Sequence, residues 1–157
     1  MKNKAFTLIE LLIVMSVIAI LVAIIIPSYR GMQQEGYLTK AEKELNTLQA
    51  AIESYYRHNG QSYPENKGKE NPNAYQEAMI KQKRFRIITQ KLEDPFQKNR
   101  APYNYSILND DNNVEYYVLW SNGINGVQDW TWDSTEGKVT MDPSRDDIVR
   151  TNAIYGD

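Results

Sequence analysis

The chain has 157 residues, which is room for one domain and an anchor. Its 18 Lys and Arg against 20 Asp and Glu give a net charge of −2, so no basic excess is present to neutralise phosphates and no nucleic-acid partner is expected. The absence of cysteine excludes disulfides, thiolate metal sites and cysteine nucleophiles. The single histidine, His58, lies in a polar segment and is expected to be a solvated surface side chain.

The chain begins with a short basic segment followed by a long apolar one. Residues 1–5 contain Lys2 and Lys4, and residues 6–26 are almost wholly apolar. About 20 apolar residues in a helix cover a hydrocarbon core of about 30 Å, so this segment can span a bilayer. Lysines before a span favour a cytoplasmic N-terminus. The sequence therefore predicts one membrane span with the rest of the chain outside the cytoplasm.

One carboxylate interrupts the apolar segment. A secretory signal peptide would have a shorter apolar core and a small-residue cleavage site, whereas this core runs directly into Pro27. A plain signal anchor is the other simple interpretation, but it gives no reason for Glu10. Since a carboxylate in a membrane segment costs a few kcal/mol, Glu10 is a candidate functional residue.

The segment at residues 4–10, KAFTLIE, resembles the prepilin motif of type IV pilins and type II secretion pseudopilins. The resemblance implies that a prepilin peptidase cuts between Ala5 and Phe6 and methylates the new amine of Phe6; alanine stands before the cut where the family usually has glycine. The family's glutamate four residues after the cut is matched by Glu10, and its proline at the end of the membrane stretch by Pro27. The Glu10 carboxylate of one subunit can then meet the N-terminal ammonium of a neighbour, which is an assembly role.

Apolar residues recur at spacings of three and four after Pro27 and predict an amphipathic helix over residues 28–60, with Gly60 as its C-terminal cap. The stripe consists of Leu38, Ala41, Leu45, Leu48, Ile52 and Tyr55. It is expected to pack on this protein's own sheet rather than on a partner. Proline removes a helical hydrogen bond, so the helix is expected to open over about residues 19–26 within a filament.

The rest of the chain predicts a small mixed head. A helix is expected to start at Asn71-Pro72 and to end at Asp94-Pro95, with Tyr75, Ala78, Met79, Phe85 and Ile88 on its apolar side. Strands are expected at 103–108, at 114–121 and within 138–141. The predicted fold class is α+β, with a long N-terminal helix whose second half packs on a small antiparallel sheet. The predicted organisation is a leader at 1–5, a membrane and assembly helix at 6–27, a stalk helix at 28–60 and a head at 61–157.

The order of short motifs in the head is similar to that in the major pseudopilins of type II secretion. The motifs are Asp94-Pro95-Phe96, Pro102-Tyr103, Trp120-Ser121-Asn122-Gly123 and Asp146-Asp147-Ile148. The resemblance implies a structural subunit of a filament used for protein export, and the alternative is a type IV pilin for adhesion, motility or DNA uptake. It also implies other copies of the chain, minor pseudopilins, an inner-membrane assembly platform and membrane lipid as partners, and a head in the periplasm.

Major pseudopilins hold one calcium ion, and the resemblance extends to residues that suit it. Calcium takes six to eight oxygen ligands. The resemblance implies Asp146 and Asp147 as side-chain ligands, with Asn125 and the Asn122 backbone opposite. Asparagine at 125 stands where the family has an aspartate, which removes a charge.

Two further aspartates leave the predicted calcium site open to a different ligand set. Asp129 and Asp133 lie between the loop at 122–126 and the acids at 146–147, and either could substitute as a ligand. The alternative is an Asn-Gly turn and a solvated acidic loop that holds no ion.

Two other groupings invite a different function. Three tryptophans could form a stacking platform for sugars together with Tyr116 and Tyr117, or they could simply fill the head's core; they are Trp120, Trp130 and Trp132. The acid pair at 110–111 and the acids at 129 and 133 lie in turn-like polar segments without an apolar pocket to raise a pKa. With no phosphate-binding glycine loop or nucleophile motif, no enzyme activity is expected.

Overall fold

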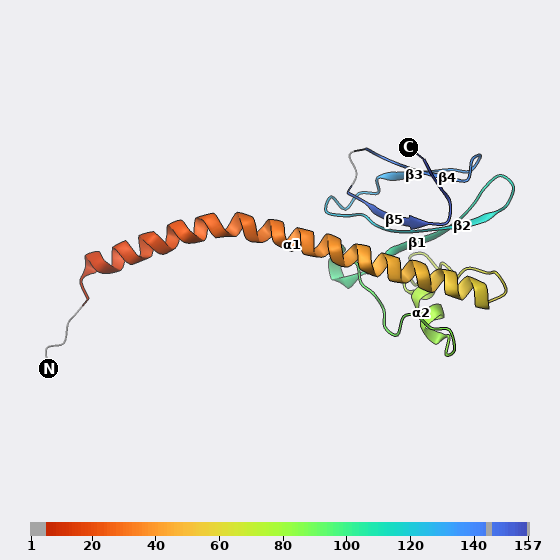
Figure 1. Ribbon diagram of the computed structural model, residues 1–157, viewed down its shortest axis with the longest axis horizontal. Helices are drawn as coiled ribbons and strands as arrows, with labels where there is room; N and C mark the ends of the chain where they lie inside the picture. The colour runs from red at the N-terminus through yellow and green to blue at the C-terminus, as the bar shows by residue number, and fades with distance from the viewer. Residues whose placement is uncertain (1–5, 144–145, 157) are drawn as a thin grey trace. The chain divides into compact units, whose positions relative to one another are not determined.

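The computed structural model describes residues 6–143 and 146–156. The chain divides into two units, Met1–Gly36 and Tyr37–Asp157, named here the anchor and the head (Figure 1). The predicted leader, including Ala5, lies outside the described residues.

A single helix, α1 (Leu8–His58), contains the predicted membrane segment and the predicted stalk. It is helical across Pro27 in the isolated chain. Gly60 follows it with a φ of 66°, and the Gln61 N–H donates to the Tyr56 carbonyl at 3.1 Å. This bond across the left-handed glycine closes the helix as predicted.

The apolar stripe of α1 forms the core of the head. Ala41, Leu45, Leu48 and Ile52 are each 0% exposed. They pack with the inward-facing aromatic and aliphatic side chains of the first sheet, which include Tyr105, Tyr117 and Leu119. The predicted α+β class, with the second half of the long helix packed on a small sheet, is confirmed.

The head contains two three-stranded sheets where the sequence predicted one. Sheet 1 has the order β1-β2-β5 and is antiparallel; its strands are β1 (Asn104–Asn109), β2 (Glu115–Ser121) and β5 (Ile148–Thr151). Sheet 2 has the order β3-β4-β6 and pairs β4 with β6 in parallel; its strands are β3 (Trp130–Asp133), β4 (Lys138–Met141) and β6 (Ile154–Gly156). The predicted strands correspond to β1, β2 and β4, and the other three strands were not predicted.

Strand β2 has apolar side chains on both faces because it lies between two cores. Tyr117 and Leu119 face α1, whereas Val118 and Trp120 pack in a second cluster with Trp130 of sheet 2. Val139, Val149 and Ala153 complete the buried part of this second cluster. The head is thus layered as helix, sheet 1 and sheet 2 (Figure 1).

The predicted limits of the second helix were wrong. Helix α2 spans Ala74–Lys81 with Asn73 at its N-cap, and Ile88 is buried outside it. The buried Gln76 side chain explains the early end, because it accepts the Leu92 N–H at 2.7 Å and donates to the Leu92 carbonyl at 2.9 Å. This pairing holds the following chain extended rather than helical. A short 3-10 turn, η1 (Lys98–Arg100), precedes β1.

Candidate functional site

The anchor exposes apolar side chains on every side. The large apolar residues from Phe6 to Ile26 are between 46% and 86% exposed. The most apolar window of α1 has a mean hydropathy of 3.2, and the helix is long and apolar enough to cross a membrane. This segment therefore needs lipid or other protein to cover it.

Glu10 caps the start of α1. Its carboxylate accepts the Thr7 N–H at 2.9 Å and the Thr7 hydroxyl at 2.8 Å, and its own N–H donates to the Thr7 hydroxyl oxygen at 3.3 Å. These reciprocal bonds form a capping box, which satisfies N–H groups that a helix start leaves unpaired. The Thr7-x-x-Glu10 spacing is the sequence signal for this role, which we had not predicted.

The loop after β2 folds over Asp146 in the head. The Ile124 and Asn125 N–H groups donate to Asp146 Oδ2 at 2.5 and 2.9 Å. Gly123 makes this approach possible, since its φ is 59° and a Cβ there would collide with the Asp146 backbone carbonyl. The structure thus brings the loop at 122–126 and Asp146 together, as the resemblance implied.

Two further carboxylates complete the cluster. Asp147 is 8% exposed, and its Oδ2 accepts the Asp129 N–H at 2.8 Å. One carboxylate oxygen from each of Asp129, Asp146 and Asp147 lies within 4.8 Å of the other two. Asp133 lies outside this cluster and accepts the N–H groups of Thr135 and Glu136 in the turn after β3.

The electrostatics of the acidic cluster favour a cation. Burial, together with the nearby charges of Asp129 and Asp146, raises the pKa of Asp147 to about 6, although the hydrogen bond from the Asp129 N–H acts in the opposite direction. Among the described residues, Asp146 Oδ1 and Asp147 Oδ1 are buried without a hydrogen-bond partner. Unpaired buried carboxylate oxygens are costly, and a cation bound between them would offset that cost. The donor set therefore fits a calcium ion.

The two predicted asparagine ligands are engaged in the loop itself. The Asn122 carbonyl accepts the Gly126 N–H at 3.1 Å, and its side-chain Oδ1 accepts Trp120 Nε1–H at 2.7 Å. Asn125 Oδ1 accepts the Val127 N–H at 2.6 Å, and its amide donates to Asp129 Oδ2 at 2.8 Å. Asn125 thus contacts the acidic cluster through Asp129, while Asn122 shapes the loop.

Residues 1–26 match the prokaryotic N-terminal methylation motif. This match covers the region with the predicted cleavage site and Glu10, and it supports processing by a prepilin peptidase. With the apolar helix that follows, it fits membrane anchoring with a head outside the membrane.

The chain is also similar to fimbrial proteins and to a type IV pilin. It is 41% identical over 59 residues to fimbrial protein EcpB of Eikenella corrodens, covering 38% of this chain and 37% of the relative. It is 47% identical over 52 residues to a fimbrial protein of Pseudomonas aeruginosa, covering 33% of this chain and 34% of the relative. It is 40% identical over 55 residues to type IV major pilin protein PilA of Myxococcus xanthus, covering 35% and 25%.

The matches to relatives cover only part of each protein. The chain spans 34–37% of the length of the first relatives that it matches. No solved structure matches the chain. The motif and the relatives together support a type IV pilin-like filament subunit, and the activity of the whole protein follows as a proposal.

Proposed function

We propose that this protein is a structural subunit of a pseudopilus that takes part in protein export by a type II secretion system. The methylation motif and the fimbrial relatives support the filament subunit. The loop at 122–126 folded on Asp146 supports the export filament, because the resemblance to major pseudopilins implies this arrangement. The protein acts by assembly and carries out no reaction.

In this proposal the anchor has two successive environments. Membrane lipid covers its apolar side chains before assembly, with the head in the periplasm and the N-terminus in the inner membrane. Neighbouring anchors cover the same side chains in the filament. Cleavage before Phe6 by the prepilin peptidase creates an ammonium, and Glu10 of an adjacent subunit pairs with it. Other partners are minor pseudopilins and the inner-membrane assembly platform.

We also propose that the acidic cluster binds calcium. Asp129, Asp146 and Asp147 would supply carboxylate oxygens, and the two unpartnered oxygens of Asp146 and Asp147 are the first that an ion would take. Calcium would offset most of the negative charge of the cluster and tie the loop at 122–126 to the segment before β5. A loop too polar to fold by apolar burial gains its order in this way.

A second candidate function is a type IV pilin for adhesion, motility or DNA uptake. The names of the relatives favour it, since they are fimbrial proteins and a major pilin. A gene deletion in the cells that make this protein distinguishes the two functions. Deletion of its gene should leave exported proteins in the periplasm while surface pili and motility remain. Normal export with loss of pili would instead support the second candidate.

Processing is tested separately. Mass spectrometry of the membrane-extracted protein should show a chain that begins at Phe6 and carries one added methyl group. Removing Lys2 and Lys4 takes the net charge from −2 to −4, which an isoelectric shift would report. Cells without prepilin peptidase serve as the control and should retain the chain from Met1. A chain beginning at Met1 in cells with the peptidase would contradict the proposal at its base.

A further inference from the structure

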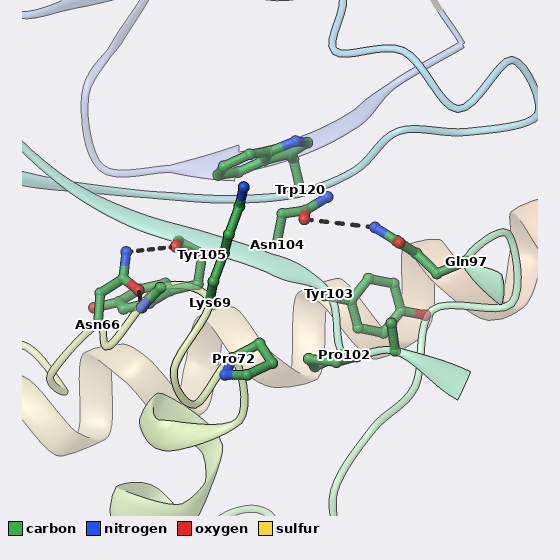
Figure 2. A pocket seen from close by; sticks show the side chains of 11 residues that line it. Asn66, Lys69, Pro72, Gln97, Pro102, Tyr103, Asn104, Tyr105 and Trp120 are labelled. Carbon is green, nitrogen blue, oxygen red and sulfur yellow. Dashed lines mark hydrogen bonds between the residues drawn. The ribbon is translucent and has the colours of Figure 1, made fainter. Parts of the chain in front are cut away.

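A cavity of about 430 Å³ opens at the end of sheet 1, beside the start of β1 (Figure 2). Its volume lies within the range of about 300–1,000 Å³ of small-molecule sites. Its walls combine rings and prolines with amide side chains and one lysine, and they include Lys69, Gln97, Asn104, Tyr105 and Trp120. We name it the Trp120 pocket, and none of the three carboxylates of the acidic cluster lines it.

Strand pairing places an aromatic ring beside an amide in this pocket. Asn104 and Trp120 are direct partners in the antiparallel register of β1 and β2. Side chains of such a pair emerge on the same face of the sheet and lie next to each other. Figure 2 shows both side chains at the pocket, with Gln97 beyond Asn104.

Trp120 offers the pocket an apolar surface that is held in place. Its indole N–H is already bonded to Asn122 Oδ1 at 2.7 Å, and its ring meets Trp130 edge-on with centroids 4.9 Å apart. The half-buried ring therefore presents carbon atoms of its π system to a ligand rather than a hydrogen-bond donor. Of the three tryptophans that suggested a sugar platform, this one lines the pocket, while Trp130 is buried in the second core.

The polar groups of the pocket have bonding capacity to spare. Gln97 Nε2 reaches Asn104 Oδ1 only at 3.5 Å, the long limit of a hydrogen bond. Within the described residues the Gln97 amide oxygen has no partner, so this side chain can both donate and accept. The Asn104 amide donates to Asn122 Oδ1 at 3.2 Å, and its second N–H has no partner among the described residues. Vicinal hydroxyl groups, which also both donate and accept, match the remaining capacity of the two side chains.

Lys69 gives the pocket a positive charge. Its side chain is exposed and extends toward Trp120 (Figure 2). Within residues 6–143 and 146–156, no carboxylate forms an ion pair with its ammonium, whereas the neighbouring Lys67 is 3.5 Å from Glu65. A carboxylate on a ligand is the complementary group.

A peptide strand is poorly suited to this site. The Tyr105 carbonyl on the edge strand β1 accepts the Asn66 amide at 2.9 Å, and the Tyr103 carbonyl accepts the Tyr75 hydroxyl at 3.0 Å. Strand addition needs free carbonyl groups along an edge, and these two are taken. The pocket thus offers side-chain amides and a ring face in place of a backbone edge.

We propose that the Trp120 pocket binds an acidic saccharide. The sugar ring stacks on Trp120, its hydroxyl groups bond to Gln97 and Asn104, and its carboxylate pairs with Lys69. This binding is independent of the filament proposal, because every residue involved belongs to the head.

Titration of the full chain in detergent tests the proposal, with a trimer of galacturonic acid as the acidic probe and a trimer of galactose as the neutral one. The wild type should bind the acidic trimer more tightly. Lys69→Gln should weaken the acidic trimer by about five- to tenfold and leave the neutral one unchanged. Lys67→Gln is the matched control and should change neither, since Lys67 does not line the pocket.

Trp120→Leu should abolish binding of both trimers, and Trp132→Phe, outside the pocket, should not. If near-UV circular dichroism shows that Trp120→Leu is unfolded, Gln97→Leu takes its place and should weaken both trimers several-fold. The proposal is overturned if neither trimer binds at millimolar concentration, or if the neutral trimer binds as tightly as the acidic one. Wild-type affinity in Lys69→Gln and Gln97→Leu would overturn it too.

Discussion

The anchor and the head use the same kind of helix in opposite ways. In the anchor, the large apolar side chains of α1 up to Ile26 are all at least 46% exposed, whereas Leu45, Leu48 and Ile52 in the head are 0% exposed. The anchor is apolar around its whole circumference, and the head part of α1 has a single stripe. Lipid or other protein must therefore cover the apolar side chains of the anchor, while the head buries its own apolar stripe. Mutations can separate the dependence of the anchor on its surroundings from the dependence of the head on its core.

Glu10 should have the largest effect, and it should act on assembly alone. Glu10→Gln keeps the capping-box geometry but removes the charge, so it should insert normally and yield almost no filaments. Thr7→Val removes the capping hydroxyl and keeps the charge, so it should assemble close to normally. Filament yield by electron microscopy, in cells without wild-type subunit, measures both. The reverse result would assign Glu10 to the helix cap rather than to a neighbour's ammonium.

A core substitution should separate the two regions by stability. Leu48→Ala removes a fully buried side chain from the stripe and should lower the free energy of unfolding of the head by about 2–5 kcal/mol. Leu21→Ala removes the same atoms from a side chain that is 54% exposed and should change it by less than about 0.5 kcal/mol. Near-UV circular dichroism of the full chain in detergent reports the head, because all three tryptophans lie there. Equal losses of stability in the two variants would contradict the division between anchor and head.

Calcium removal should destabilise the head without affecting the anchor. An ion present at about 100 times its dissociation constant adds about 2.7 kcal/mol to the stability of the state that binds it. Melting with calcium and with EGTA should differ accordingly for the wild type and for Asp133→Asn, whose carboxylate lies outside the cluster. Asp146→Asn should lose the difference. Identical wild-type melting curves would leave Asp146 and Asp147 as ordinary acids.

The smallest effect concerns pH. In EGTA, the folded-state pKa of Asp147 is about 6 against an ordinary 3.8, so ionisation of this carboxyl costs stability. Asp147→Asn should therefore be more stable than the wild type above pH 6, with the difference disappearing as the pH falls below about 4. Added calcium should reverse the order at pH 7, because the ion needs the carboxylate. A difference independent of pH would show that burial does not shift this group.

Local sequence patterns predicted the elements whose structure follows from residue spacing and residue type alone. The stripe of α1 was predicted because its spacing follows the helical period, and β2 because its residues favour strands. Strand β3 was missed because Trp130–Asp133 lies among turn residues and pairs only within the folded head. The end of α2 depends on Gln76 binding the backbone of Leu92, 16 residues away, which no local pattern contains.

The candidate site residues also divide into those that a local motif predicts and those that depend on tertiary contacts. Phe6 and Glu10 follow from a contiguous motif, which the match to residues 1–26 supports. Asp146 was expected near the loop through resemblance, but Asp129 entered only as a possible substitute, because its place depends on the return of β4 past β3. The fit of Gly123 against the Asp146 carbonyl is a tertiary contact that the sequence does not predict.

One short segment of the chain supplies the third strand of both sheets. Strands β5 and β6 lie consecutively in residues 148–156, yet β5 joins sheet 1 and β6 joins sheet 2. A ribosome makes this segment after the other four strands of the two sheets, so until it emerges each sheet has two strands, which are marginally stable alone. Until residues 148–156 have been synthesised, the apolar stripe of α1 is incompletely covered. A chain cut short before Ile148 would therefore remain open and sensitive to proteases, so closure of the head requires that synthesis has passed β5 and β6.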